Sequence, residues 1–242
     1  MELVDGAQHI SATSDWYRRS AHRNHLNFTR MFRFAASDFV FDSTPDILDY
    51  GGGGGQFASV VRSHLPVALV HLLDIDDDSG LPGWEELSTR IRFDEFESDS
   101  TQFDLIFMND VYEHVIEPVE LLTQLASKLK PGGRIFIDTP RQFWLYPITK
   151  IFAPPIHDKL LRGTVTKMHL QIWSDDSLRR SIERADLEVK RWERWGEYTQ
   201  EPGYYLKNMG ITNPVIRLAG RLLYRLGGGL ARNKLAVLLG NR

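Results

Sequence analysis

The chain has no cysteine among its 242 residues, which excludes disulfide bonds, thiolate metal sites and a cysteine nucleophile. It also has no run of about 18 apolar residues, so no membrane-spanning helix is expected. The N-terminal residues lack the basic start and apolar core of a signal peptide, and we therefore expect a cytoplasmic protein. The formal net charge of -3 leaves no basic excess, which argues against binding to nucleic acid.

The composition, with 42% hydrophobic and 25% charged residues, is typical of a globular protein with a buried core. Short apolar runs alternate with amphipathic segments along the chain. The apolar runs predict strands at 46–50, 67–74, 103–109, 133–139, 188–195 and 234–240. The amphipathic segments predict helices at 56–65, 117–130 and 174–186. This alternation predicts an α/β fold with a mostly parallel sheet and helices on both faces.

Five consecutive glycines follow the first predicted strand, in the sequence DYGGGGGQF at 49–57. A flexible tether would have polar, low-complexity flanks, whereas this run lies between a strand and a helix. Glycines at such a turn permit positive φ angles and let a ligand approach the backbone and the helix N-terminus. We therefore predict a ligand-binding loop.

The glycine run fits two nucleotide-binding patterns. One is the dinucleotide pattern G-x-G-x-x-A beginning at Gly53, and the other is D-x-G-x-G-x-G beginning at Asp49. Asp74, at the end of the second predicted strand, can bind ribose hydroxyls in either case. The glycines alone leave the choice between the two ligands open.

Five segments occur in order over about residues 46–195, namely ILDYGGGGGQF, LLDID, QFDLIFMNDVYEHV, LKPGGRIFIDTP and HLQIWSDDSLRRSIERADLEV. This ordered set resembles the class I S-adenosylmethionine-dependent methyltransferases, near the ubiquinone-biosynthesis O-methyltransferases and methyltransferase types 11 and 12. The resemblance implies a Rossmann-like, doubly wound sheet of seven strands, mostly parallel, with one antiparallel strand supplied by KLAVLLGNR. It implies S-adenosylmethionine as the cofactor and S-adenosylhomocysteine as its product.

The resemblance also implies a single methyltransferase domain over residues 1–242. Residues 1–44 would form an N-terminal helical cover, and residues 45–195 the cofactor-binding core. Residues 141–168, which are rich in aromatic residues and proline, are too long for a plain connection, so we expect a lid-like insertion there. Residues 196–242 would hold a basic amphipathic helix and the last strand.

The resemblance assigns roles to the residues of the glycine loop. Gly51, Gly53 and Gly55 would pass under the methionine part of the cofactor, and Asp49 would hold the loop and approach the amino group. Asp74 would accept hydrogen bonds from both ribose hydroxyls, because a carboxylate can accept two at once.

Other cofactor contacts are implied farther along the chain. Ile75 would lie against adenine, and Phe93 and Asp94 match a place where the family often contacts the adenine edge. Asn109 would contribute main-chain contacts near the sulfonium. Gly52 occupies a position that often holds a small or polar residue, which predicts extra backbone freedom in the loop.

Asp110, Glu113 and His114 follow the fourth predicted strand, where the transferable methyl group should lie. His114 has the right unperturbed pKa to accept a proton near neutral pH, or it is a structural contact. We expect no metal cofactor, although Asp110, Glu113 and His114 also fit a spacing that some ubiquinone-pathway relatives use for a divalent cation. His169 either reaches the substrate or anchors the predicted lid.

The resemblance implies transfer of a methyl group to a small-molecule acceptor, more readily on oxygen than on nitrogen or carbon. A catalytically silent cofactor-binding scaffold or regulator is the alternative from another class. A nicotinamide-dependent (NAD) oxidoreductase is disfavoured by the LKPGG and EH elements. Residues 213–226 form a basic amphipathic pattern, which fits a surface helix packed on the domain or a contact with a membrane surface or a partner.

Overall fold

The computed structural model describes most of the chain, namely residues 15–37, 39–41, 43–75, 87–141, 169–196, 213–215, 218, 219, 222 and 232–242. The strands are β1 (Asp46–Tyr50), β2 (Leu69–Leu73), β3 (Thr89–Ile91), β4 (Phe103–Asn109), β5 (Leu129–Pro140), β6 (Leu187–Trp195) and β7 (Lys234–Asn241). The described ranges contain the α-helices α1 (Asp15–Ala35), α2 (Gln56–His64), α3 (Pro118–Ser127) and α6 (Asp175–Arg184).

The strands form one seven-stranded sheet in the order β3-β2-β1-β4-β5-β7-β6. The pairs from β3 to β5 are parallel, and β7 runs antiparallel to both of its neighbours, β5 and β6. This arrangement agrees with the predicted sheet, including the antiparallel strand at the C-terminus, and is consistent with a Rossmann-like fold. All six predicted strands are present, and β3 is the strand that the sequence did not predict, because three residues are too few to show a period.

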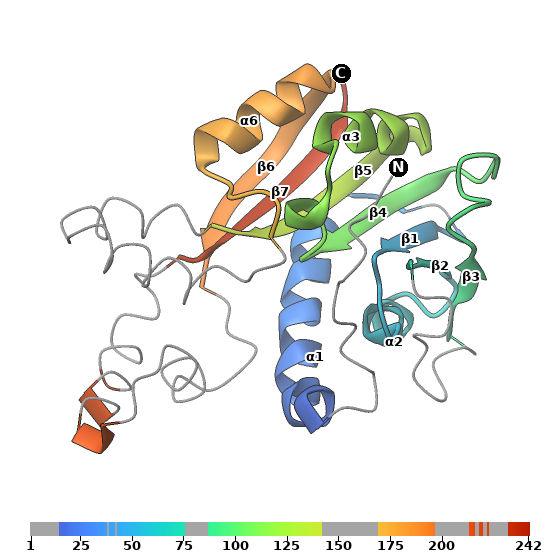
Figure 1. Cartoon of the computed structure of the whole chain (residues 1–242). Coiled ribbons are helices and arrows are strands. Elements are labelled where there is room, and N and C mark those ends of the chain that lie inside the picture. Colours follow the sequence, from blue (N-terminus) through green and yellow to red (C-terminus); the bar gives the residue numbers. More distant parts are fainter. Residues whose placement is uncertain are drawn as a thin grey trace.

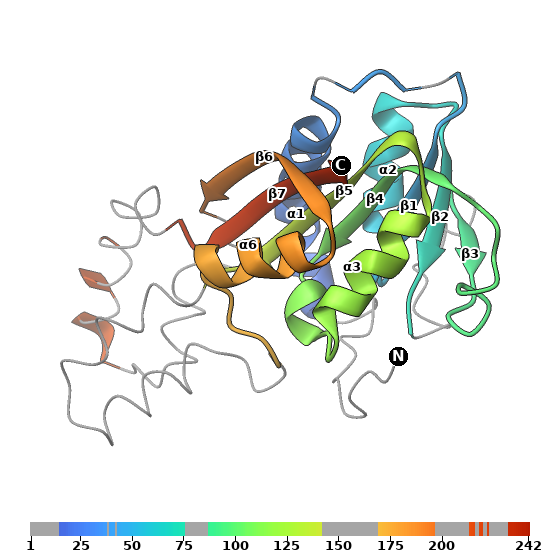
Figure 2. The same ribbon diagram turned by 90° about the horizontal axis from the view of Figure 1, so that it is seen from above.

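Helices cover both faces of the sheet (Figures 1 and 2). α1 and α2 lie together on one face, and α3 and α6 lie together on the other. β4, in the middle of the sheet, is buried from Phe103 to Met108. A strand buried along almost its whole length is typical of a parallel sheet covered on both sides.

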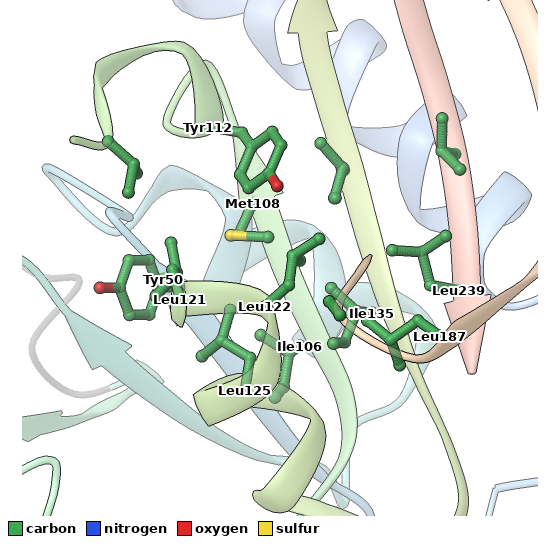
Figure 3. Packing of buried hydrophobic residues seen from close by; sticks show 14 of the residues in the cluster. Tyr50, Ile106, Met108, Tyr112, Leu121, Leu122, Leu125, Ile135, Leu187 and Leu239 are labelled. Carbon is green, nitrogen blue, oxygen red and sulfur yellow. The ribbon is translucent and has the colours of Figure 1, made fainter. Parts of the chain in front are cut away.

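The core on the α3 side contains the largest fully buried side chain, Tyr112. Figure 3 shows it with Met108 of β4 and with the leucines that α3 directs toward the sheet. The Tyr112 hydroxyl donates to the carbonyl of Pro118 at 3.1 Å and is 2.7 Å from the hydroxyl of Ser181 in α6. The segment that follows β4 is therefore fixed to both covering helices.

The core on the other face is built from phenyl rings. Phe57 of α2 stacks on Phe107 of β4 with centroids 3.6 Å apart, and Phe107 stacks on Phe136 of β5 at 4.9 Å. Met31 and Phe34 of α1 are buried in the same cluster. The C-terminal half of α1 is thus a part of the core.

The boundary between α3 and β5 differs from the prediction. The expected helix over 117–130 ends at Ser127, and β5 begins at Leu129 rather than at residue 133. Gly132 has a φ of 80°, and a Cβ atom on Gly133 would lie 2.8 Å from the carbonyl oxygen of Phe103. The Pro-Gly-Gly sequence at 131–133 therefore lies within an irregular start of the strand.

Two predicted segments fall mainly outside the described residues. Of the expected lid over 141–168, only Arg141 is described, and its guanidinium pairs with Asp175 at 2.7 Å. Of the basic helix expected over 213–226, six residues are described, and the side chains of Val215 and Leu218 are exposed. None of the helices in the described ranges is long and apolar enough to cross a membrane.

A charged cluster holds the amino ends of the central strands together. Lys130 of β5 donates from Nζ to Asp46 of β1 and to Asp104 of β4, each at 2.7 Å. His71 of β2 lies 3.1 Å from the other oxygen of Asp46. Burial alone would raise the pKa of the Asp46 carboxyl, but the hydrogen bonds from Lys130 and His71 outweigh it and lower the pKa.

We predict that Lys130→Met lowers the free energy of unfolding by about 1–3 kcal/mol at pH 7, because it leaves the buried Asp104 without its cation. Since the pKa of Asp46 is lowered on folding, this stabilisation is present above its usual value of 3.8 and is lost as the pH falls through the folded value. Urea unfolding at pH 7 and at about pH 3.5 should therefore show the difference from wild type shrinking in acid.

The matched control is Lys190→Met, which removes a lysine whose partner is the exposed Glu188. Exposed pairs contribute little, so this variant should unfold like wild type at both pH values. Equal unfolding curves for Lys130→Met and Lys190→Met at pH 7 would contradict the role of the cluster.

Candidate functional site

Three of the polar residues predicted to be functional, together with Asp138, which sequence reasoning did not single out, lie at the carboxyl edge of the parallel strands. Asp49 lies near the end of β1, Asp74 follows β2, Asn109 ends β4 and Asp138 lies near the end of β5. Ligands of open α/β sheets bind at this edge, where the strand order reverses. In this sheet the reversal falls between β1 and β4.

The glycine loop leaves β1 with three positive φ angles, 73° at Gly51, 51° at Gly53 and 79° at Gly55. These are the three glycines that the resemblance places under the cofactor. The amides of Gly51 and Gly52 donate to the Leu73 carbonyl at 2.7 and 3.3 Å. The loop therefore rests on the end of β2, in a conformation that residues with a side chain rarely adopt.

Gly52 is required by close packing, which revises the expectation that it gives the loop extra freedom. A Cβ atom there would lie 2.3 Å from Leu72 Cδ1 and 2.4 Å from Asp49 Oδ2. Both neighbours are almost fully buried, so a side chain at position 52 would have to displace Leu72 or Asp49. Glycine therefore fits this position better than the small or polar residue that the resemblance leads one to expect.

Asp49 is 3% exposed, and within the described residues its Oδ2 atom has no hydrogen-bond partner. Burial, and then the charge of nearby Asp74, raise the pKa of the Asp49 carboxyl to about 8. A carboxylate that is buried this far from water is stabilised by a cation that contacts it. The pKa is therefore poised to fall when a positively charged group binds.

Asp74 accepts a hydrogen bond from the amide of Gly53 at 2.8 Å, so it fastens the middle of the glycine loop. Ile75, the next residue, is 43% exposed, which leaves an apolar surface beside the loop. Phe93 packs partly against the core, whereas Asp94 is exposed and pairs with Arg92 at 3.2 Å. The adenine contacts expected of Phe93 and Asp94 stay predictions.

Asp110 follows β4 with a φ of 53°, a strained angle for a residue with a side chain. Its carboxylate pairs with Lys234, the first residue of β7, which also donates to Asp138 at 2.6 Å. Asp138 accepts in turn from the indole of Trp195 at 2.7 Å. Sequence reasoning missed Lys234, because it lies 124 positions from Asp110 and its surroundings read as an ordinary strand.

The charges in this cluster are unevenly buried. The Lys234 side chain is 8% exposed and that of Asp138 is fully buried, whereas the Asp110 side chain is 40% exposed. Desolvation alone would raise the pKa of Asp110, but the charge and hydrogen bond of Lys234 lower it. Lys234 thus holds an ionised carboxylate at the edge of the site.

Glu113, His114 and His169 come together beside Asp110. The Nε2 atoms of His114 and His169 lie 3.9 and 3.8 Å from Oε1 of Glu113, and Thr139 donates to Oε2 at 2.9 Å. Their candidate ligand atoms all lie within 4.8 Å of one another. His169 thus joins Glu113 and His114 of the predicted metal set, and Asp110, the third member of that set, lies beside them and pairs with Lys234.

The two histidines differ in their suitability as a base. Burial, and then the neighbouring His114, lower the pKa of His169 to about 4. The side chain of His169 is 9% exposed, against 32% for His114. The backbone also fixes this part of the chain, because the amides of Leu170 and Gln171 both donate to the Glu113 carbonyl at 2.9 Å. His114 is therefore the more accessible proton acceptor.

The edge of the sheet fits the cofactor implied by the resemblance. Three buried acceptor oxygens there have no hydrogen-bond partner among the described residues, namely Asp49 Oδ2, Asn109 Oδ1 and Glu113 Oε1. Buried polar atoms are nearly always paired, so this set indicates a ligand rich in donors. An ammonium group and hydroxyls are donors of the required kind.

Comparison with known proteins agrees with this geometry. A family model described as a methyltransferase domain matches residues 18–191. The chain is 29% identical over 127 residues to the ubiquinone biosynthesis O-methyltransferase of Coxiella burnetii (strain RSA 493 / Nine Mile phase I), covering 49% of this chain and 53% of that protein. It thus spans about half the length of this curated relative. The enzyme of the same name from Xylella fastidiosa (strain M23) is 25% identical over 200 residues, covering 76% and 80%.

Solved structures share the fold at low sequence identity. A structure described as a complex between the Haloferax volcanii Trm112 methyltransferase activator and a putative methyltransferase has a TM-score of 0.64 at 13% identity, covering 96% of each chain. The plantazolicin methyltransferase BpumL, solved with a triazolic desmethylPZN analog and SAH, has a TM-score of 0.55 at 17% identity, covering 93% of this chain and 86% of that one.

We predict that Lys234→Met destabilises the protein by about 3 kcal/mol at pH 7. The substitution leaves the fully buried Asp138 without its cation and next to the negative charge of Asp110. Urea unfolding measures this loss. The double variant Lys234→Met/Asp138→Asn should recover a large part of it, since a buried amide needs no counter-ion. Wild-type stability in the single variant, or no recovery in the double one, would refute this account of the cluster.

Proposed function

Because the chain belongs to the methyltransferase-domain family, in the class I S-adenosylmethionine-dependent group, we propose that it transfers a methyl group to a hydroxyl oxygen of a small-molecule acceptor. The observation that carries this proposal is the juxtaposition of two sites at one edge of the sheet. The glycine loop with Asp49 and Asp74 lies at the ends of β1 and β2. The polar cluster of Asp110, Glu113, His114 and His169 follows β4, across the point where the strand order reverses.

In this proposal the loop residues hold the cofactor, which supplies a methyl group on a positively charged sulfur. Gly51, Gly53 and Gly55 keep the backbone open for it, Asp49 receives the ammonium group, and Asp74 receives the ribose hydroxyls. Ile75 offers the apolar surface for adenine. Asn109 ends β4, directly before Asp110 of the acceptor cluster.

At the acceptor end, the residues orient a hydroxyl and accept its proton. Displacement at a methyl carbon depends mainly on alignment of the nucleophile, and a neutral alcohol or phenol gains from a base. His114 is the base in this proposal, because it is more exposed than His169 and its Nε2 atom faces buried Glu113. Asp110, ionised and held by Lys234, accepts a hydrogen bond from the acceptor.

The neutral state of His169 fits an uncharged acceptor, such as a hydroxyl group, better than a cationic amine. Its lowered pKa keeps the imidazole uncharged near pH 7, as a hydrogen-bonding wall for a neutral acceptor. The relatives at 25–29% identity are named as O-methyltransferases, which supports the same choice.

We expect S-adenosylhomocysteine to bind more tightly as the pH rises from 6 toward 8. Asp49, with a pKa of about 8, holds a proton below that value and must lose it to pair with the ligand ammonium. The dissociation constant should therefore fall by up to about tenfold per pH unit in this range. Calorimetry measures it, and Asp49→Asn should bind more weakly with a flat pH profile. A flat wild-type profile would contradict the role of Asp49, and no binding at all would contradict the family's cofactor in this chain.

We expect His114→Ala to lower the rate of methyl transfer about 100-fold, the range for a general base, while calorimetry shows unchanged affinity for S-adenosylhomocysteine. The assay follows tritiated methyl groups from S-adenosylmethionine into pools of phenols, quinols and sugars. His25→Ala is the control, because His25 is an exposed residue of α1. An unchanged rate in His114→Ala would refute the base.

Two further outcomes of the same assay are informative. Binding of the cofactor without methyl transfer to any acceptor pool would favour the catalytically silent cofactor-binding scaffold. Loss of transfer with a chelator, restored by a divalent cation, would assign Glu113, His114 and His169 to a metal instead of a base.

A further inference from the structure

Asn24 of α1 and Gln56 of α2 are polar residues at positions where both helices are otherwise apolar. Asn24 lies one turn before Phe28, on the face of α1 that continues through Met31, and it is 8% exposed. Gln56 is 7% exposed and begins a helix whose next residue is the buried Phe57. Burying an amide costs free energy unless it is hydrogen-bonded, and departures from the apolar pattern are expected at functional positions.

The two amides meet across the interface between α1 and α2. Asn24 Nδ2 donates to Gln56 Oε1 at 3.3 Å, over a sequence separation of 32 residues. The support for Asn24 is rigid, because Phe28 packs edge-on against Phe57 at 6.0 Å and against Phe107 at 6.2 Å. The pair is therefore held in place by the aromatic core of that face.

Gln56 is also the residue at which the glycine loop ends. Its helix has Gly55 as the N-cap, with a φ of 79° and no side-chain cap. The start and middle of the loop are hydrogen-bonded to β2 and to Asp74, as described above. The hydrogen bond from Asn24 provides a third anchor, at the end of the loop, and it comes from a different element.

We propose that Asn24 is a positioning residue for the cofactor loop, which raises cofactor affinity by holding Gln56 and so fixing where the loop enters α2. This inference rests on the proposed function. Five glycines have more backbone freedom to lose on ordering than any other residues. Each anchor that orders the loop beforehand reduces the entropy lost when a ligand binds. Helix α1 is thereby part of the cofactor site although it contributes none of the predicted contacts.

The test uses calorimetry with S-adenosylhomocysteine at pH 8, together with urea unfolding, on the full chain. Asn24→Leu and Gln56→Met should each weaken binding about tenfold, as expected for a lost buried hydrogen bond. The double variant should bind about as weakly as either single variant, because all three lack the same interaction. The exchanged pair, Asn24→Gln with Gln56→Asn, should bind within about threefold of wild type.

Thr29→Ala is the matched control, because the Thr29 hydroxyl donates to the His25 carbonyl of its own helix at 2.8 Å. It should leave the dissociation constant unchanged. A purely structural role for the pair would change the unfolding curves but not the affinity, and that result would overturn the inference. Additive effects in the double variant would also overturn it. If wild type itself fails to bind, the proposed function and the inference fail together, whereas wild-type binding with unaffected variants overturns the inference alone.

Discussion

The burial of the sheet on both faces is the constraint on which the rest of the structure depends. With α1 and α2 on one side and α3 and α6 on the other (Figure 2), residues in the middle of the central strands, such as Ile106 and Phe107 of β4, are fully buried. Polar side chains therefore gather at the strand ends. Each end has one lysine that bridges two carboxylates, Lys130 at the amino edge and Lys234 at the carboxyl edge.

The two clusters are alike in composition and differ in what surrounds them. At the amino edge, the cation, its acids and a histidine satisfy one another, and the cluster holds strands together. At the carboxyl edge, Asp49, Asn109 and Glu113 each keep a buried oxygen without a hydrogen-bond partner in the described part of the chain. Unpaired acceptors raise the free energy of the ligand-free protein, and a ligand with donors recovers that free energy on binding. The same physics thus gives a structural cluster at one edge and a candidate site at the other.

The glycine loop depends on this arrangement in a way that composition does not reveal. A Cβ atom on Gly52 would collide with the side chains of Asp49 and Leu72, so glycine at this position leaves room for the buried acid. Its neighbours with positive φ angles turn the chain toward the end of β2. The loop is shaped by contacts with β2 and, in our proposal, with α1, and its five glycines permit that shape without specifying it.

The sequence alone determined the elements with strong local signals. The strands at 46–50 and 103–109 are found as predicted, and Ser174 caps α6 by accepting from the amide of Ser177 at 3.1 Å. These features depend on neighbours along the chain, and the order of the family's segments carried the assignment of the fold. Tertiary structure alone decided that Lys234 pairs with Asp110, that His169 joins Glu113 and His114 beside Asp110, and that Asn24 meets Gln56. Such contacts join residues that lie far apart in the sequence. Their charges and amides interact strongly only once folding has brought them together and removed them from water.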